Sequence, residues 1–254
     1  MKNTKTIIKQ GDLFQLGDHK LLCGDSTNEA TIKILVGKAK IKSVNTDVPY
    51  GIAYVESKAN FKQKIACNKI IANDQVQSDD EYRLFNIKWI EAIKPYLEKK
   101  NSFYIFNSDK MIFALRQAML DSGLKFSQLL VWVKNHAVVG RLDYLPQHEL
   151  VAVGWYGTHE FLKSKDKSVL FCPKPNKSKD HPTTKPVSLI RGLILNSTRI
   201  GDYIFDGFGG SGTAMIACEQ TKRKCLMIEL DPGYCQTIIN RYEKLTSFKA
   251  KKLN

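Results

Sequence analysis

The sequence predicts an α/β protein in which helices cover both faces of a doubly wound, mostly parallel sheet. Short apolar runs alternate with amphipathic helical patterns along most of the 254 residues, as in chains built from β-α-β units. One apolar run ends in a glycine-rich turn that leads directly into a helix, a junction found at ligand sites of such sheets. With 43% hydrophobic and 25% charged residues, the composition is typical of one large globular domain.

The charge of the chain favours a polyanionic partner. The net charge is +14 at pH 7, which suggests nucleic acid, although a basic surface without such a partner has the same composition. No apolar run reaches the about 18 residues of a membrane span, and no apolar segment follows the N-terminus as in a secretory signal. Six cysteines without a CxxC pair and five histidines without ligand spacing predict a cytoplasmic protein with reduced thiols and no metal.

The first predicted elements are strands over 6–10 and 20–23 and a helix that ends near Val36 and is capped by Ser26 or Thr27. Asp25 lies between the second strand and this helix. An acid at the carboxyl end of a strand can contact a ligand in an open α/β sheet. An aspartate that only stabilises the turn before the helix fits the local pattern as well.

The next strand, 41–46, leads into a motif that can hold a planar polar group, Asp47-Val48-Pro49-Tyr50-Gly51. Asp47 supplies a carboxylate, and Pro49 lacks an N–H but keeps its carbonyl as an acceptor. Tyr50 offers a ring face on which a base can stack. An ordinary Pro-Gly turn is the alternative interpretation.

The middle of the chain continues the alternation of helices and strands. Predicted are a helix over 79–97, a strand over 102–106, a helix from Ser108 or Asp109 to Asp121, and strands over 126–134 and 148–155. Two basic stretches, 56–75 and 156–180, are interpreted as loops whose lysines contact DNA phosphates, with solvated linkers as the alternative. The basic tail, 247–254, is predicted to be frayed.

A helix over 187–196 and a strand over 203–205 precede the glycine-rich turn, Asp206-Gly207-Phe208-Gly209-Gly210-Ser211-Gly212. Glycines in such a turn let backbone N–H groups come close to a ligand. A helix over 213–220 and a strand over 225–228 follow, and the strand ends in Glu229, an acid placed to hold ribose hydroxyls. A sharp connection in an ordinary sheet is the alternative.

Three motifs therefore stand in a fixed order: the motif at 47–51, then His181-Pro182-Thr183-Thr184-Lys185-Pro186, then the glycine-rich turn at 206–212. In this order they closely resemble the circularly permuted, beta-type amino-group DNA methyltransferases, from about residue 10 to 245. The resemblance implies one methyltransferase domain over 1–254, a seven-stranded sheet with one antiparallel strand, and S-adenosylmethionine as cofactor. It also implies double-stranded DNA as substrate and a role in restriction-modification.

The resemblance assigns a role to each motif residue. Asp47, Pro49 and Tyr50 would form the catalytic pocket for a target base flipped out of the duplex. The cofactor would be held by Asp25 at its adenine, by Glu229 at its ribose, and at its methionine end by Thr184, Lys185, Asp206, Phe208, Gly209, Gly210, Ser211 and Gly212.

Two positions depart from the family pattern, because Gly207 and Val48 stand where the family has proline. Val48 adds an N–H and loosens the turn, but it leaves the Pro49 carbonyl in place. An acid at position 47 favours transfer to N6 of adenine. Transfer to N4 of cytosine is one alternative, and a catalytically impaired DNA-binding module of the same fold is the other.

Larger members of this family carry a recognition domain before the His181–Pro186 motif, whereas here the stretch from 134 to 180 holds one strand and a basic loop. Lysine–phosphate contacts position a protein on DNA without reading its sequence. We therefore expect short target sites of low stringency, or specificity supplied by a homodimer or a partner subunit.

Overall fold

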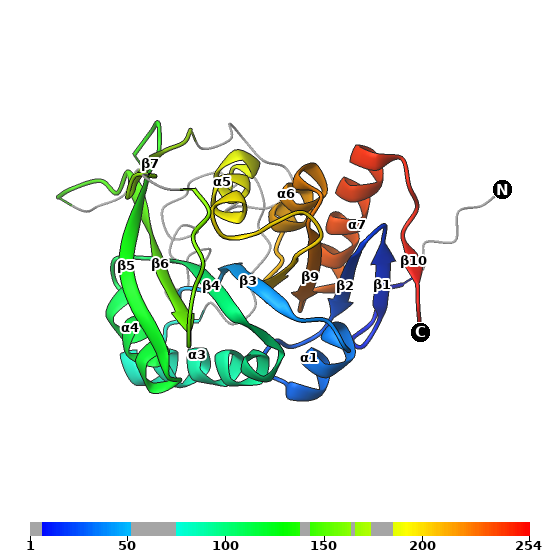
Figure 1. Ribbon diagram of the computed structural model, residues 1–254, viewed down its shortest axis with the longest axis horizontal. Helices are drawn as coiled ribbons and strands as arrows, with labels where there is room; N and C mark the ends of the chain where they lie inside the picture. The colour runs from blue at the N-terminus through cyan, green and yellow to red at the C-terminus, as the bar shows by residue number, and fades with distance from the viewer. Residues whose placement is uncertain (1–6, 52–74, 138–142, 164–165, 174–184) are drawn as a thin grey trace.

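The computed structural model describes residues 7–51, 75–137, 143–163, 166–173 and 185–254 (Figure 1). These residues form one sheet of ten strands. In sheet order the strands are β10 (Lys251–Lys252), β1 (Leu13–Leu16), β2 (His19–Cys23), β9 (Lys224–Glu229), β8 (Tyr203–Asp206), β3 (Ile41–Asp47), β4 (Leu97–Asn107), β6 (His148–Tyr156), β5 (Leu124–Val133) and β7 (Val169–Phe171).

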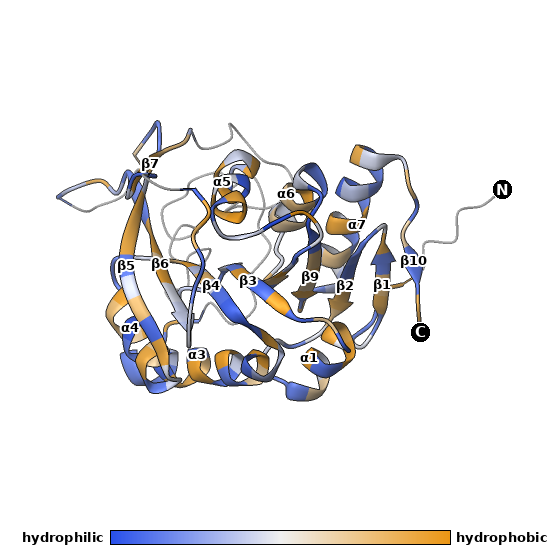
Figure 2. Cartoon of the chain, in the orientation of Figure 1, coloured by the Kyte–Doolittle hydropathy of each residue, from blue (hydrophilic) through white to orange (hydrophobic). Residues whose placement is uncertain are grey.

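Helices cover both faces of the sheet, as the sequence predicts. One face carries α5 (Val187–Ser197), α6 (Thr213–Thr221) and α7 (Pro232–Thr246), and the other carries α1 (Glu29–Val36), α3 (Asp79–Ile93) and α4 (Ile112–Asp121) (Figure 1). Each helical layer packs its own cluster of buried apolar side chains against the sheet. Figure 2 shows hydrophobic and hydrophilic residues on each of these helices, as expected for amphipathic helices between a sheet and solvent. The α/β architecture is confirmed.

The expected strand number was too small, and the sheet is mixed. Strands β2, β9, β8, β3 and β4 are mutually parallel, whereas β6 lies antiparallel between β4 and β5. Strand β7, inside the stretch interpreted as a basic loop, adds to β5 in parallel. At the other edge, β1 and β10 are antiparallel additions. These three short edge strands account for the difference between seven and ten.

The first predicted strand was misplaced, because β1 occupies 13–16 and not 6–10. The two residues between β1 and β2, Gly17 and Asp18, form the tight turn of a β-hairpin. Gly17 has a φ of 57°, a conformation that two-residue hairpin turns require and that glycine adopts without strain. The hairpin turn therefore sets the register of β1, and the described residues before it, 7–12, form no strand.

The predicted frayed tail was also wrong. Lys251 and Lys252 pair with Gln15 and Phe14 of β1, and the Leu253 N–H donates to the Leu13 carbonyl at 2.8 Å. An ion pair of 2.7 Å joins Lys252 Nζ to Asp12 Oδ1. The end of the chain is thus held along β1 by backbone hydrogen bonds and by charge.

Helix boundaries differ from the predictions by a few residues. Asn28, not Ser26 or Thr27, caps α1, since its side chain accepts from the Ala30 N–H. Helix α4 begins at Ile112, after a turn that contains the predicted caps Ser108 and Asp109. Helix α3 ends at Ile93 because Pro95 follows in a short 3₁₀ turn, η1 (Lys94–Tyr96), and β4 already starts at Leu97.

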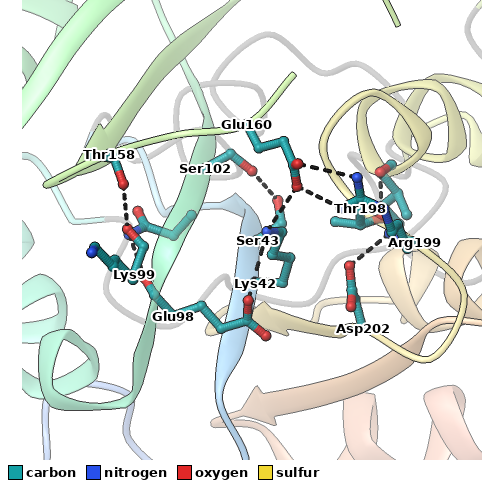
Figure 3. A network of polar contacts seen from close by, with 12 residues as sticks. Lys42, Ser43, Glu98, Lys99, Ser102, Thr158, Glu160, Thr198, Arg199 and Asp202 are labelled. Atoms are coloured by element: carbon teal, nitrogen blue, oxygen red, sulfur yellow. Dashed lines mark hydrogen bonds and ion pairs between the residues drawn. The ribbon is translucent and has the colours of Figure 1, made fainter. Parts of the chain in front are cut away.

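The edge formed by the starts of β3 and β4 is held by a network of charges (Figure 3). Lys42, only 5% exposed, pairs with Glu160 Oε2 at 3.3 Å and with Glu98 Oε2 at 3.7 Å. Glu160 also pairs with Arg199 at 2.6 Å. The Glu160 carboxylate therefore joins the end of β6 to β3 and to the segment after α5, at the edge opposite Asp47.

No helix in the described part of the chain is long and apolar enough to cross a membrane.

Candidate active site

The carboxyl ends of β8 and β3 lie side by side at the centre of the sheet. From β8 the chain passes to α6 on one face, and the next helix described after β3 is α3 on the other face (Figure 1). Ligands of open α/β sheets bind where neighbouring strands diverge in this way. Thr46 Oγ1 donates to Asp206 Oδ1 at 2.8 Å, so the motif at 47–51 and the glycine-rich turn share this position.

Asp47 is the last residue of β3, and its side chain is 28% exposed. Its Oδ2 accepts from Lys185 Nζ at 2.5 Å, and its Oδ1 accepts from the Tyr50 hydroxyl at 3.0 Å. Lys185 stands just before α5, so a third segment of the chain contributes to the site. The site combines an accessible carboxylate, an aromatic ring and a buried ammonium group.

Two residues that the sequence analysis missed complete this cluster. Glu149 Oε2 lies 3.0 Å from Lys185 Nζ and accepts from the Tyr50 hydroxyl at 3.1 Å. Lys134, only 4% exposed, pairs with Glu149 Oε1 at 2.7 Å. Asp47, Glu149, Lys134 and Lys185 thus form a network of two half-buried acids and two buried bases, which we call the four-charge cluster.

Burial and the neighbouring charges shift the pKa values of Glu149, Asp47 and Tyr50. Burial would raise the pKa of Glu149, but the Lys185 and Lys134 ammonium groups lower it to about 2. Burial, together with the negative charge of Glu149, raises the pKa of Asp47 although Lys185 acts against it. Burial also raises the pKa of Tyr50 well above its usual value, so its hydroxyl remains a donor.

The glycine-rich turn is tied to the end of β9 through Glu229. The Gly210 N–H donates to Glu229 Oε2 at 2.7 Å, and the Asp231 N–H donates to Oε1 at 2.8 Å. The Gly24 N–H donates to the Glu229 carbonyl at 2.9 Å, which brings exposed Asp25 beside Glu229. Asp25 Oδ1 accepts from the Thr27 N–H and hydroxyl, as a turn aspartate does. This row of acids and backbone amides fits the adenosine part of S-adenosylmethionine.

The remaining residues of the turn are fixed from both sides. The Phe208 N–H donates to Asp206 Oδ1 at 3.2 Å, while the Phe208 ring packs on Phe85 and Trp89 of α3. From α7, Arg241 Nη1 donates to the Ser211 carbonyl at 2.5 Å and to its hydroxyl at 2.9 Å. The turn is therefore anchored through Phe208 and Ser211. No sequence pattern predicted that Arg241 would contact this turn.

Gly209 and Gly212 are glycines for steric reasons. A Cβ at Gly209 would lie 2.8 Å from the Met227 side chain, and Gly212 has a φ of 81° at the start of α6. Thr184, a predicted cofactor residue, lies outside the described residues, as do 56–74 of the first basic stretch and 164–165 and 174–180 of the second.

We expect the free protein to lose stability as the pH rises from about 6 to about 8. Burial raises the pKa of Asp206 and of Glu229 to about 7, so the folded state holds more protons than the unfolded chain above about pH 4. This stabilisation is complete below about pH 4 and is lost progressively as the pH rises to about 7, so the interval from 6 to 8 contains the last part of the loss. His19, whose pKa is lowered by burial, acts in the opposite direction. Thermal melts should show Tm falling by at least about 2–4 °C, the shift produced by 1 kcal/mol.

Asp206→Asn provides the control for this pH dependence, since the amide fills the same space without titrating. Its Tm should change less between the two pH values than that of the wild type. A wild-type Tm that rises over this interval would show that the two carboxylates titrate normally.

Comparison with known proteins identifies the family. Residues 41–241 match the family model described as DNA methylase of the N6/N4 type. The type II methyltransferase M2.DpnII of Streptococcus pneumoniae is 26% identical over 189 residues, which cover 67% of this chain and 70% of that protein.

Solved structures show the same fold at low sequence identity. The M1.HpyAVI–SAM complex superimposes with a TM-score of 0.64 at 23% identity, covering 87% of this chain and 98% of that one. The PvuII cytosine-N4-specific DNA methyltransferase has a TM-score of 0.69 at 17% identity and covers 90% of both chains. The M1.HpyAVI structure is a complex with S-adenosylmethionine, which is the cofactor that the sequence resemblance implies. Because the family model spans most of the chain, from β3 into α7, this protein belongs to the N6/N4 DNA methylase family.

Proposed function

We propose that this protein transfers a methyl group from S-adenosylmethionine to the exocyclic N6 amine of adenine in double-stranded DNA, after the base flips out of the helix. The observation that carries the proposal is the Asp47 carboxylate, which ends β3 beside Tyr50 and next to the glycine-rich turn of β8. When bound, S-adenosylmethionine supplies an electrophilic methyl group.

The residues of the pocket can activate a poor nucleophile. The lone pair of an aromatic amine is delocalised into the ring. The Asp47 carboxylate and the Pro49 carbonyl can accept hydrogen bonds from its two N–H groups and direct the lone pair out of the ring plane. The Asp47 carboxylate can then receive the proton that the nitrogen loses when it is methylated. Tyr50 stacks on the flipped base, and its hydroxyl, held by Asp47 and Glu149, fixes the orientation of the ring. Rate then comes from positioning and electrostatics.

The experiment that tests the proposal is sequencing that reports both modified bases on DNA from cells expressing this chain. Methyl groups on adenine N6, absent from cells with Asp47→Ala, are the expected result. Modification of cytosine N4 with none on adenine would establish the alternative specificity. The acid at position 47 supports adenine.

We expect DNA binding to weaken steeply with salt. The net charge is +14, and the exposed Lys167 stands two residues before β7. Each phosphate neutralised contributes about 0.9 to the slope of log affinity against log salt, so several contacts give a slope of several units. DNA-binding titrations at three or more salt concentrations measure this slope. Binding that is insensitive to salt, with a long and strictly observed target site, would indicate a base-reading element instead.

Val48 raises a second candidate, a DNA-binding module with impaired catalysis. The Val48 side chain is only 1% exposed and packs in the cluster beneath α1, α3 and α4. Because packing already holds this turn, we expect Val48→Pro to change the rate of methyl transfer by less than about tenfold, or 1.4 kcal/mol. Single-turnover assays of both proteins give the comparison. An inactive wild type together with an active Val48→Pro variant would support the impaired module.

A further inference from the structure

The two oxygens of Asp47 are both occupied in this structure. Lys185 Nζ lies 2.5 Å from Oδ2, and the Tyr50 hydroxyl lies 3.0 Å from Oδ1. Each oxygen could accept a further hydrogen bond, but the charged Lys185 donor weakens the carboxylate as an acceptor, so a target amine bonds to it best when one of these donors moves away. Lys185 is only 6% exposed, so its ammonium group cannot turn to water and needs another acceptor inside the protein.

Glu149 is placed to be that acceptor. Its Oε2 lies 3.0 Å from Lys185 Nζ and 3.1 Å from the Tyr50 hydroxyl, so one oxygen can receive both donors. Lys134 holds the other oxygen at 2.7 Å and fixes the orientation of the carboxylate. Both ammonium groups also face aromatic rings, since Lys134 Nζ and Lys185 Nζ lie 5.3 Å and 6.0 Å from the centre of the Trp132 ring.

We propose that Glu149 is a positioning residue for methyl transfer: it receives Lys185 and the Tyr50 hydroxyl when the target amine takes their place on Asp47. The inference rests on the proposed function of Asp47 and adds to it a second carboxylate that does not touch the base. Lys134 keeps this carboxylate charged and aimed at Lys185. Without Glu149, release of Asp47 would leave Lys185 as a buried charge without a carboxylate.

The isosteric variant Glu149→Gln tests the inference, because it removes the charge and keeps the shape. The single-turnover rate of methyl transfer should fall at least about tenfold, while the dissociation constant of S-adenosylmethionine changes less than about threefold. Glu149→Asp, which keeps the charge, should recover part of the rate.

Glu160→Gln is the matched control. Like Glu149, Glu160 has a pKa lowered to about 2, here by hydrogen bonds from Arg199 and Lys42. It lies in the network of Figure 3 at the opposite edge of the sheet. Its variant should transfer methyl groups within about twofold of the wild-type rate. Equal losses in the two variants would show a general structural effect and overturn the inference.

A second readout does not require turnover. Asp47 is faced by Lys185 from the segment before α5, by Tyr50, by Glu149 of β6 with Lys134 behind it, and by Asp206 of β8. Removing the negative charge of Glu149 should lower the pKa of Asp47. Carboxyl-carbon NMR of labelled aspartate, assigned with Asp47→Asn, measures this shift in the free protein.

The two proposals can fail separately. Wild-type methylation of adenine with an unaffected Glu149→Gln rate would overturn the role of Glu149 and leave the proposed function standing. A wild type that modifies no base would overturn the proposed function. In that case an unchanged Asp47 pKa in Glu149→Gln would also overturn the coupling of the two carboxylates.

Discussion

Asp47→Asn is expected to reduce methyl transfer by at least about 10²–10³-fold, the loss seen when one group that stabilises a transition state is removed. The asparagine side chain has the same shape, but its amide bears no charge and presents an N–H₂ group where an acceptor is needed. Lys185 keeps Glu149 as its partner at 3.0 Å, so the fold should persist. Single-turnover assays with radiolabelled cofactor measure the rate.

Cofactor binding should survive this substitution. Asp206, the first residue of the glycine-rich turn, accepts hydrogen bonds from Thr46 Oγ1 and the Phe208 N–H and needs no contact with Asp47. Calorimetry should therefore give an affinity for S-adenosylmethionine within about threefold of the wild type. Asp80→Asn is the control, because its side chain is 89% exposed on α3. Full activity of Asp47→Asn would exclude this pocket as the catalytic site.

At pH 8, where the Glu229 carboxyl group is charged, Glu229→Gln is expected to weaken cofactor binding by about 10–100-fold, since hydrogen bonds to a charged group contribute about 1.5–3 kcal/mol. The wild-type carboxylate accepts from the Gly210 N–H and the Asp231 N–H with its two oxygens. Glutamine has one oxygen, so one backbone N–H would face an N–H₂ group. The variant thus loses a charge where we expect the ribose to bind and one hydrogen bond to the backbone around the glycine-rich turn.

Equilibrium binding of S-adenosylmethionine without DNA measures this loss directly. Glu219→Gln is a suitable control, because Glu219 on α6 pairs with His19 at 2.8 Å and glutamine can keep that hydrogen bond. At saturating cofactor, Glu229→Gln should recover most of its methyl-transfer rate. A variant that binds S-adenosylmethionine normally but transfers no methyl group would show that Glu229 acts in the transfer step and not in cofactor binding.

Much of the fold followed from local patterns. The unit β8-α6-β9 was predicted because an apolar run, a glycine-rich turn, a helical pattern and a second apolar run are consecutive in the sequence. The short strands β1, β7 and β10 were misplaced or missed. Lys251 and Lys252 have no apolar pattern, and they form a strand only because β1, far away in the sequence, offers free backbone groups.

The candidate site was predicted only in part, for a reason of topology. The sequence predicts site acids at the carboxyl ends of strands, and Asp47, Asp206 and Glu229 do lie there. Glu149 is near the start of its strand, but β6 runs antiparallel, so its beginning lies at the same edge of the sheet. Strand direction cannot be derived from the residues of β6 alone. Lys134 lies at the end of the predicted strand 126–134, and it meets Glu149 only because β5 and β6 pair.

The pairing of β10 with β1 also bears on aggregation. A strand at the edge of a sheet exposes unpaired backbone groups that can recruit another chain, and proteins often protect such edges with very short strands and lysines. Here the outermost strand consists of Lys251 and Lys252, whose charges discourage a further strand from docking. Truncation before Lys251 would uncover Leu13–Leu16, a longer and more apolar strand. Lys251 and Lys252 thus make this edge of the sheet less prone to pairing with another edge.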